Sequence, residues 1–227
     1  MLAKNNFIPL ANSALSFEIE HGNQLVTMAI WQGGVLKVTT RNQDQSTWGY
    51  IATGTAQLST KSGDFVLQAG MYFSADQEVT LRGNGTGLLI TQTGQKAFFH
   101  LGGPVEEKGR LRYIDGCTDS LLVPPVIKGD ACLNLLHIPP HTFQSQHTHP
   151  SLRAGIIVSG SGECMTPEGS HSLYPGLSFV IPAGGQHSFK TGDEALRVIA
   201  FHPDSDFGPT HEEHPMINRT YLTHEVS

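Results

Sequence analysis

The feature that most constrains the fold of this 227-residue chain is an internal repeat. Residues of the same type recur at one fixed offset, so that Gly49 and Gly155 lie 106 positions apart. The other matched pairs are Ile51 and Ile157, Gly54 and Gly160, Gly63 and Gly169, Leu67 and Leu173, Gly70 and Gly176, and Phe73 and Phe179. An offset that runs without a gap through two turns and the strand between them indicates a duplication. The chain is therefore expected to fold as two similar units.

Strand signals dominate both units. Short β-rich runs such as "GDFVLQAGMYFSA" and "LSFVIPAGGQHSF" are broken by glycine. No amphipathic helical pattern of about 12 or more residues stands out. The 25 glycines and 13 prolines also favour a turn-rich chain, and short strands at regular spacing are typical of a sandwich or barrel. We therefore predict an all-β protein.

The repeat and the turn signals together divide the chain. We expect two β-barrels in tandem, over residues of about 10–103 and 120–205. The polar, turn-rich segment 104–119 suits a linker or a crossover strand, and residues 206–227 are expected to form a tail.

Charge and cysteine usage restrict partners and compartment. The formal net charge is −6 and no block of Lys or Arg occurs, which argues against nucleic acid and anionic membrane as partners. The first twenty residues lack the apolar core of a signal peptide, and no apolar run reaches the roughly 18 residues of a membrane span. The three cysteines form no C-x-x-C pair, so we expect a cytoplasmic protein without a disulfide framework.

The second half carries the chemistry. In the stretch "QHTHPSLRAG", His147 and His149 stand two residues apart. On a β-strand such residues point to the same face, where two imidazoles can share a metal ion. A third histidine, His187, follows the P-x-G turn of "GLSFVIPAGGQH".

These two stretches resemble the two motifs of the cupin superfamily. The first motif has a glycine, five residues, H-x-H, three or four residues, Glu, six residues and Gly. Here the opening glycine position holds His141, which predicts a loop residue, and the Glu position holds Arg153. The second motif keeps every spacing, at Gly176, Pro182, Gly184 and His187. The resemblance, extended through the repeat, implies a bicupin built from two antiparallel jelly-roll barrels.

The resemblance also implies a metal site in the C-terminal barrel. His147, His149 and His187 would hold a divalent ion, with iron expected and Zn, Ni, Mn or Cu left open. The corresponding positions of the N-terminal half are Arg41, Gln43 and Leu81. That half is expected to be metal-free. Outside the motifs, His171, His202 and His224 are interpreted as ordinary core or surface residues, and His211 to His214 as part of the tail, with a second metal site there as the alternative.

Arg153 takes the place of a metal-binding carboxylate. A guanidinium has no free lone pair and stays protonated, so it cannot coordinate the ion. Beside a metal it would make the pocket cationic and favour a substrate carboxylate held bidentately. We therefore predict that Arg153 is catalytic, as an anion anchor. A salt bridge at the barrel mouth and an outward-facing side chain are the alternatives.

Three-histidine iron sites occur in cupin-like dioxygenases, among them gentisate-type enzymes that have S-A-L-R where this chain has "SLR". Their arginine falls two residues later, so the likeness implies no particular substrate. We predict a mononuclear iron dioxygenase that acts on a small carboxylate and forms a homodimer. The alternatives are a non-catalytic protein that binds or senses a metal or small anion, and a Zn, Mn or Ni lyase or isomerase. No general base is evident inside the motifs, because Glu163 falls in an expected turn.

Overall fold

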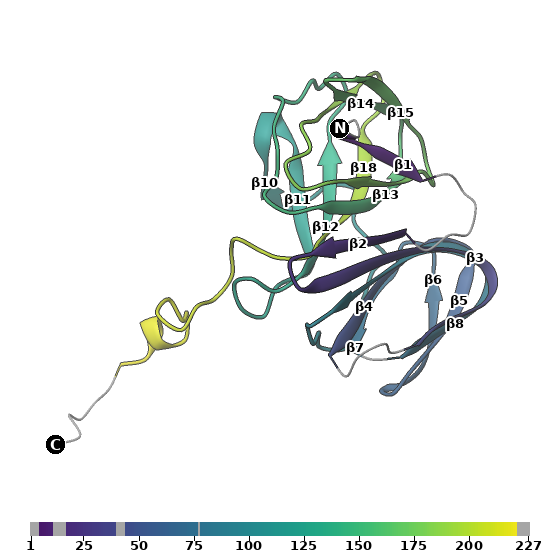
Figure 1. The fold of residues 1–227 in the computed structure, drawn as a ribbon, viewed down its shortest axis with the longest axis vertical. Coiled ribbons are helices and arrows are strands. Elements are labelled where there is room, and N and C mark those ends of the chain that lie inside the picture. Colours follow the sequence, from purple (N-terminus) through teal and green to yellow (C-terminus); the bar gives the residue numbers. More distant parts are fainter. Residues whose placement is uncertain (1–4, 11–16, 40–43, 77, 222–227) are drawn as a thin grey trace.

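The structure is a computed structural model, and it describes residues 5–10, 17–39, 44–76 and 78–221. It consists of antiparallel sheets that form two bodies of strands packed against each other (Figure 1). Helix in the described residues is confined to short 3-10 segments at Ile114–Gly116 and Ile217–Arg219. None of these described helical segments is long and apolar enough to cross a membrane. The all-β prediction is confirmed.

The first body is one sheet with the order β2-β3-β8-β4-β7-β9, in which β5 pairs with β6 and β8. Its strands are β2 (Phe17–His21), β3 (Gln24–Val38), β4 (Gln45–Thr53), β5 (Thr55–Thr60), β6 (Gly63–Gln68), β7 (Tyr72–Asp76), β8 (Val79–Thr93) and β9 (His100–Gly102).

The second body holds a sheet with the order β1-β16-β13-β18-β12-β11-β10 and a smaller sheet with the order β15-β14-β17. Its strands are β1 (Ile8–Leu10), β10 (Leu111–Arg112), β11 (Thr118–Val123), β12 (Cys132–Ile138), β13 (Arg153–Ser159), β14 (Gly162–Thr166), β15 (Gly169–Leu173), β16 (Ser178–Ile181), β17 (Ser188–Thr191) and β18 (Leu196–His202). Strand β10 and the start of β11 lie within the segment 104–119, where the sequence suggested a linker or crossover strand.

The repeat is visible in the packing of matched residues. Gly49 pairs with Phe73 across β4 and β7, and Gly155 pairs with Phe179 across β13 and β16. A Cβ atom at Gly49 would lie 2.2 Å from Cε1 of Phe73, and one at Gly155 would lie 2.8 Å from Cζ of Phe179. Both distances are too short for a carbon–carbon contact. A phenylalanine ring lies over the glycine in each half, and at Gly155 the carbonyl oxygen of Ile199, 2.5 Å from the added Cβ, excludes a side chain as well.

The turns repeat as well. The amide of Gly70 donates to the carbonyl of Ile51 at 2.8 Å, and that of Gly176 donates to the carbonyl of Ile157 at 2.8 Å. The φ angles of the two glycines are +86° and +87°, a left-handed region that costs glycine little. The turn contacts of these matched residues therefore recur at the offset read from the sequence.

A hydrophobic core lies between the two bodies, in addition to the core of each body. It contains Trp48 and Met28 from the first body and Phe201 and Leu135 from the second. The rings of Trp48 and Phe201 have their centroids 5.0 Å apart. The two halves therefore bury apolar side chains against each other.

The N-terminal strand β1 lies on the second body rather than the first. Ile8 pairs with Val180 on β16, and the preceding Phe7 stacks on Phe179 with ring centroids 5.2 Å apart. The first described residues thus form the edge strand of the large sheet of the second body.

Candidate metal centre

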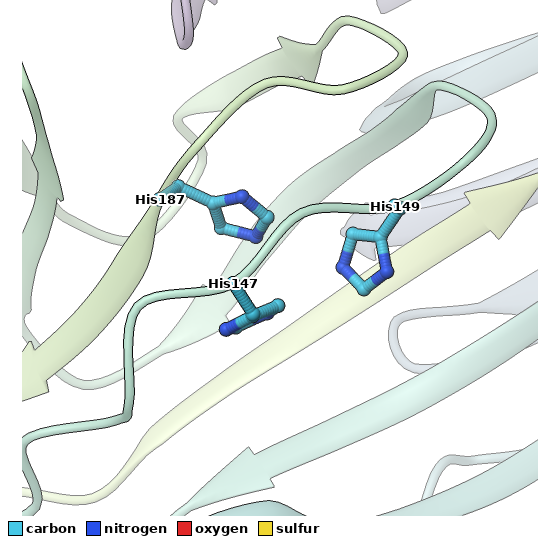
Figure 2. A group of neighbouring side chains, drawn as sticks. All are labelled: His147, His149 and His187. Atoms are coloured by element: carbon cyan, nitrogen blue, oxygen red, sulfur yellow. The ribbon is translucent and has the colours of Figure 1, made fainter.

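The three motif histidines come together although they lie on irregular segments. His147 and His187 form an isolated β-bridge, in which each amide donates to the other carbonyl, at 2.9 and 3.0 Å. The carbonyl of His149 accepts from the amide of Gly184 at 2.8 Å, which fixes the second segment to the first. The H-x-H pair therefore lies outside the regular strands, but its two side chains still point to one place (Figure 2).

The side chains are close enough to share one ion. One ring nitrogen from each of His147, His149 and His187 lies within 4.8 Å of the other two. The ring centroids are 4.4 Å apart for His147 and His187, 5.0 Å for His147 and His149, and 5.3 Å for His149 and His187. Three imidazoles at such distances can bind a divalent transition metal and leave further coordination positions open.

Two of the rings are oriented by the backbone. Nδ1 of His147 lies 2.8 Å from the carbonyl oxygen of Ser145, and Nδ1 of His187 lies 3.0 Å from that of Gly185. Because a carbonyl can only accept, each Nδ1 must carry the proton and donate it. The lone pair is then left on Nε2, as in metal-binding histidines whose other nitrogen is hydrogen-bonded. The donor set therefore fits a metal ion.

The electrostatics keep two of the rings neutral. Burial lowers the pKa of His149 to about 3, and the positive charge of Arg153 adds to the effect. Burial lowers the pKa of His187 to about 4, and its bond to Gly185 opposes the shift only in part. A neutral imidazole is the form that binds a metal, so both rings are ready to bind at neutral pH.

The histidines line a cavity of about 360 Å³ in the second body. Side chains on β11, β12, β13, β16 and β18, all strands of the large sheet, also line this cavity. Much of the lining is apolar, including Leu121, Leu136, Phe179, Phe189 and Val198. The cavity can hold a small molecule beside the histidines.

Arg153 begins β13 and also lines this cavity. Its Nη1 donates to the hydroxyl of Ser151 at 2.7 Å, to the carbonyl of Ser151 at 3.2 Å and to that of Leu152 at 2.9 Å. Its Nε is buried and has no hydrogen-bond partner among the described residues. Neighbouring residues of the same segment therefore bind Nη1 of the guanidinium, while Nε remains an unused donor.

Sequence reasoning missed two polar side chains of the cavity. His202 at the end of β18, interpreted above as an ordinary histidine, lines the cavity wall. Burial lowers its pKa well below the ordinary value, and nearby Arg153 acts in the same direction. Asp119 on β11 also lines the cavity. Asp119 and Leu121 are two residues apart on one strand, so their side chains point to the same face. This spacing is the signal that could have placed Asp119 beside an apolar wall.

Other residues considered from the sequence lie elsewhere. His141 has a φ of +55°, in the left-handed region that suits the glycine it replaces, and its exposed ring lies 3.7 Å from Asp193. Glu163 lies on β14, not in a turn, and its carboxylate is 3.5 Å from Nζ of Lys190.

The described part of the first half offers no matching set of ligands. Leu81 is fully buried in its apolar core, while Arg41 and Gln43 fall outside the described residues. Across the residues that the structure describes, His147, His149 and His187 are the group of potential ligands close enough to share an ion. His211 and His214 in the tail are not part of such a group.

Residues 134–202, which contain the three histidines, match the family model "Cupin domain". None of the curated proteins matches the chain in sequence. Solved structures share its fold at low identity. A cupin 2 conserved barrel domain protein from Leptotrichia buccalis has a TM-score of 0.61 at 13% identity, over 85% of this chain and 90% of that one.

Two enzymes are among the similar structures. A mutant of salicylate 1,2-dioxygenase from Pseudoaminobacter salicylatoxidans has a TM-score of 0.60 at 8% identity, over 83% of this chain and 75% of that one. Oxalate decarboxylase from Bacillus subtilis, described with Mn(II) centres, has a TM-score of 0.52 at 12% identity, over 92% of this chain and 79% of that one. Residues 134–202 are therefore similar to a cupin domain, and the chain shares its fold with these solved structures.

Proposed function

We propose that this protein is a metal-dependent bicupin enzyme that acts on a small carboxylate. The observation that carries the proposal is the convergence of three imidazole nitrogens within 4.8 Å in the wall of a cavity. His147, His149 and His187 would hold a single divalent ion, with iron as the favoured metal. Iron bound in this way would supply the activation of O₂, so the favoured reaction is that of a mononuclear dioxygenase.

The residues of this chain would prepare the substrate. The apolar side chains of the cavity exclude water, which strengthens the attraction between charges inside it. Arg153 supplies a positive charge in the cavity wall, and its unpartnered Nε can donate to a carboxylate. An anionic substrate would therefore be bound with its carboxylate at Arg153 and its body against the apolar wall.

Features of the fold support the two-barrel form of the proposal. The contacts of Gly49 with Phe73 and of Gly155 with Phe179 repeat at the same offset in both halves. We propose that residues 10–103 and 120–205 are two cupin barrels joined by residues 104–119, and that the protein is a homodimer. The cysteines of the described structure, Cys117, Cys132 and Cys164, are buried and unpaired, which suits a cytoplasmic protein.

The proposal is tested by oxygen consumption. Protein reconstituted with Fe(II) is expected to consume O₂ over many turnovers with at least one member of a panel of small aromatic and aliphatic carboxylates. The His187→Ala variant, treated in the same way, should show only the background rate. Binding of the carboxylates without turnover, with Fe or with Zn, Mn and Ni, would favour the non-catalytic alternative.

A second candidate is a Zn, Mn or Ni lyase or isomerase. It is favoured by Asp119, because a carboxylate in the cavity supplies the general base that the sequence motifs lack. Turnover that requires no O₂ would select this candidate over the dioxygenase.

A further inference from the structure

The carboxylate of Asp119, in the cavity wall, is bound by an amide side chain. Nδ2 of Asn134, on the neighbouring strand β12, donates to Oδ1 of Asp119 at 3.1 Å and to Oδ2 at 3.2 Å. The side chain of Asn134 is almost fully buried, at 5% exposure. A neutral amide therefore binds both oxygens, and among the described residues no cation is paired with this carboxylate.

Asn134 carries a second sign of a ligand. It lines the cavity together with Asp119, and its Oδ1 is buried without a hydrogen-bond partner in the described structure. A buried acceptor that stays unpaired costs free energy, and a donor group on a bound molecule would satisfy it. Asn134 therefore binds Asp119 through Nδ2 and keeps an unused acceptor beside the cavity.

The groups around Asp119 leave it able to change its charge. Its register partner is the apolar Leu136 on β12, and Leu111 faces it on β10. Burial raises the pKa of Asp119 to about 6, and the bonds from Asn134 oppose that shift. Tyr113 and Cys132 nearby have pKa values raised by burial, so both stay neutral in the same pH range. Besides the three motif histidines, the other charged or titratable side chains of the cavity wall are those of Arg112, Arg153, His202 and Asp206. Outside the wall, Glu106 accepts a hydrogen bond from the hydroxyl of Ser120, the residue that follows Asp119.

We propose that Asp119 is a proton-transfer group of this cavity and that Asn134 is its positioning residue. The inference rests on the proposed function, in which the cavity holds a small substrate beside the three histidines. In the forward step the carboxylate of Asp119 takes a proton from a C–H or O–H group of the substrate, and the electron pair stays on the substrate. In the return step the neutral carboxyl gives a proton to the product or to water. The ligand expected in this cavity is therefore a small carboxylic acid. It has a second ionisable hydrogen, on a C–H or O–H group separate from the carboxylate.

The first test needs neither metal nor substrate. A water-soluble carbodiimide reacts with protonated carboxyl groups that it can reach, and glycine ethyl ester then traps the adduct as an amide that mass spectrometry locates. Metal-free protein is treated from pH 5 to pH 7.5, with exposed Asp64 on β6 as the internal reference for a carboxyl in open solvent. Asp119 should label several-fold more than Asp64 at pH 6. In Asn134→Leu, which lacks the opposing amide, that labelling should persist to higher pH.

The second test measures the proton transfer with pyruvate as the probe. The Zn-loaded protein is incubated with pyruvate in D₂O, and loss of the methyl proton signal is followed by NMR. Wild type and the control Asp64→Asn should exchange the methyl protons at the same rate. The isosteric Asp119→Asn, which can still accept from Asn134, should bind pyruvate within about twofold and exchange it about a hundred-fold more slowly.

The outcomes separate this inference from the proposed function. Equal exchange in wild type and Asp119→Asn, or bound pyruvate that does not exchange in either, overturns the role of Asp119. Labelling of Asp119 that does not exceed that of Asp64 overturns it as well. Failure of pyruvate to bind the loaded protein counts against carboxylate binding in the proposed function, and the labelling result alone then decides the role of Asp119.

Discussion

Arg153 is tied to Asp204 through the hydroxyl of Ser151. That hydroxyl accepts from Nη1 of Arg153 at 2.7 Å and donates to Oδ1 of Asp204. Oδ2 of Asp204 lies 3.3 Å from Nε2 of His21 on β2. The half without the three histidines therefore contacts the chain of bonds that positions the cavity arginine.

Removing the link should loosen Arg153 without removing its charge. In Ser151→Ala, Nη1 keeps its backbone acceptors and loses the side-chain one. A lost hydrogen bond to a charged group is worth about 1.5 kcal/mol, so carboxylate affinity of the metal-loaded protein should fall by about tenfold. Calorimetric titration measures this, with exposed Ser62→Ala as the control. Unchanged affinity would show that Arg153 is positioned without Ser151.

Substitution of Arg153 itself should separate metal binding from anion binding. Arg153→Glu places a carboxylate at the position where the cupin motif has one, so metal affinity should be kept or increased. The same change removes a charge-assisted bidentate partner worth about 1.5–3 kcal/mol, so carboxylate affinity should fall about ten- to hundred-fold. Arg153→Lys should be intermediate, because it keeps the charge and loses the planar fork. Equal carboxylate affinities in all three proteins would contradict the anion-anchor role.

The metal content should be one divalent ion per chain. The described part of the first half has no ligand group comparable to His147, His149 and His187. Elemental analysis after reconstitution should give a ratio near one, and His187→Ala should lose most of the metal because two histidines make a weak site. His211→Ala, in the exposed tail, should retain it. A ratio near two, or no metal after reconstitution, would contradict the prediction.

Asp119 should make the metal-free protein less stable above pH 6. Its pKa is raised to about 6 in the folded protein from 3.8, so the fold favours the protonated form. The contribution of Asp119 to stability is then greatest below pH 4, falls as the pH rises from about 4 to 6, and stays reduced above that range. Asp119→Asn should increase the free energy of unfolding by about 1–2 kcal/mol at pH 7.5, and the gain should vanish near pH 4. Urea unfolding at the two pH values measures both, and a gain that does not depend on pH would contradict the assignment.

The two glycines under phenylalanine rings should behave differently with respect to the site. Gly49→Ala and Gly155→Ala each force a methyl group into a ring, which should cost about 1–3 kcal/mol of stability. Gly155→Ala displaces Phe179 of the cavity wall and should also weaken ligand binding, whereas Gly49→Ala should leave it unchanged. Gly192→Ala has open space around the new carbon and serves as the control. Thermal unfolding and ligand titration of the three variants provide the comparison.

Much of this arrangement could be predicted because it is encoded in spacing. Positive-φ glycines such as Gly70 and Gly176 recur wherever the same turn recurs, so the duplication shows in the sequence. The convergence of His147, His149 and His187 follows from motif spacing that a shared fold imposes. These features depend on local geometry, which one sequence is able to show.

Other features depend on contacts between distant segments, and a single sequence does not reveal them. Nothing near Asp119 indicates that Asn134 will lie beside it, because their pairing depends on the register of β11 against β12. The pairing of Ile8 with Val180 places an N-terminal strand on the second body. The 106-residue offset between the halves gives no indication of this pairing. The same holds for the bond between Ser151 and Asp204, which lie in separate loops.

The core shared by the two bodies has a consequence for the history of the chain. If the halves arose by duplication, as the repeat suggests, each copy could lose metal ligands only while its packing role was still met. Met28 and Trp48 pack against Leu135 and Phe201, so deleting the first copy would expose the apolar outer face of the second to water. Substitution could therefore change the chemistry of the first half freely while its packing surface had to persist. The first half thus serves the second as a packing surface, whatever its own side chains bind.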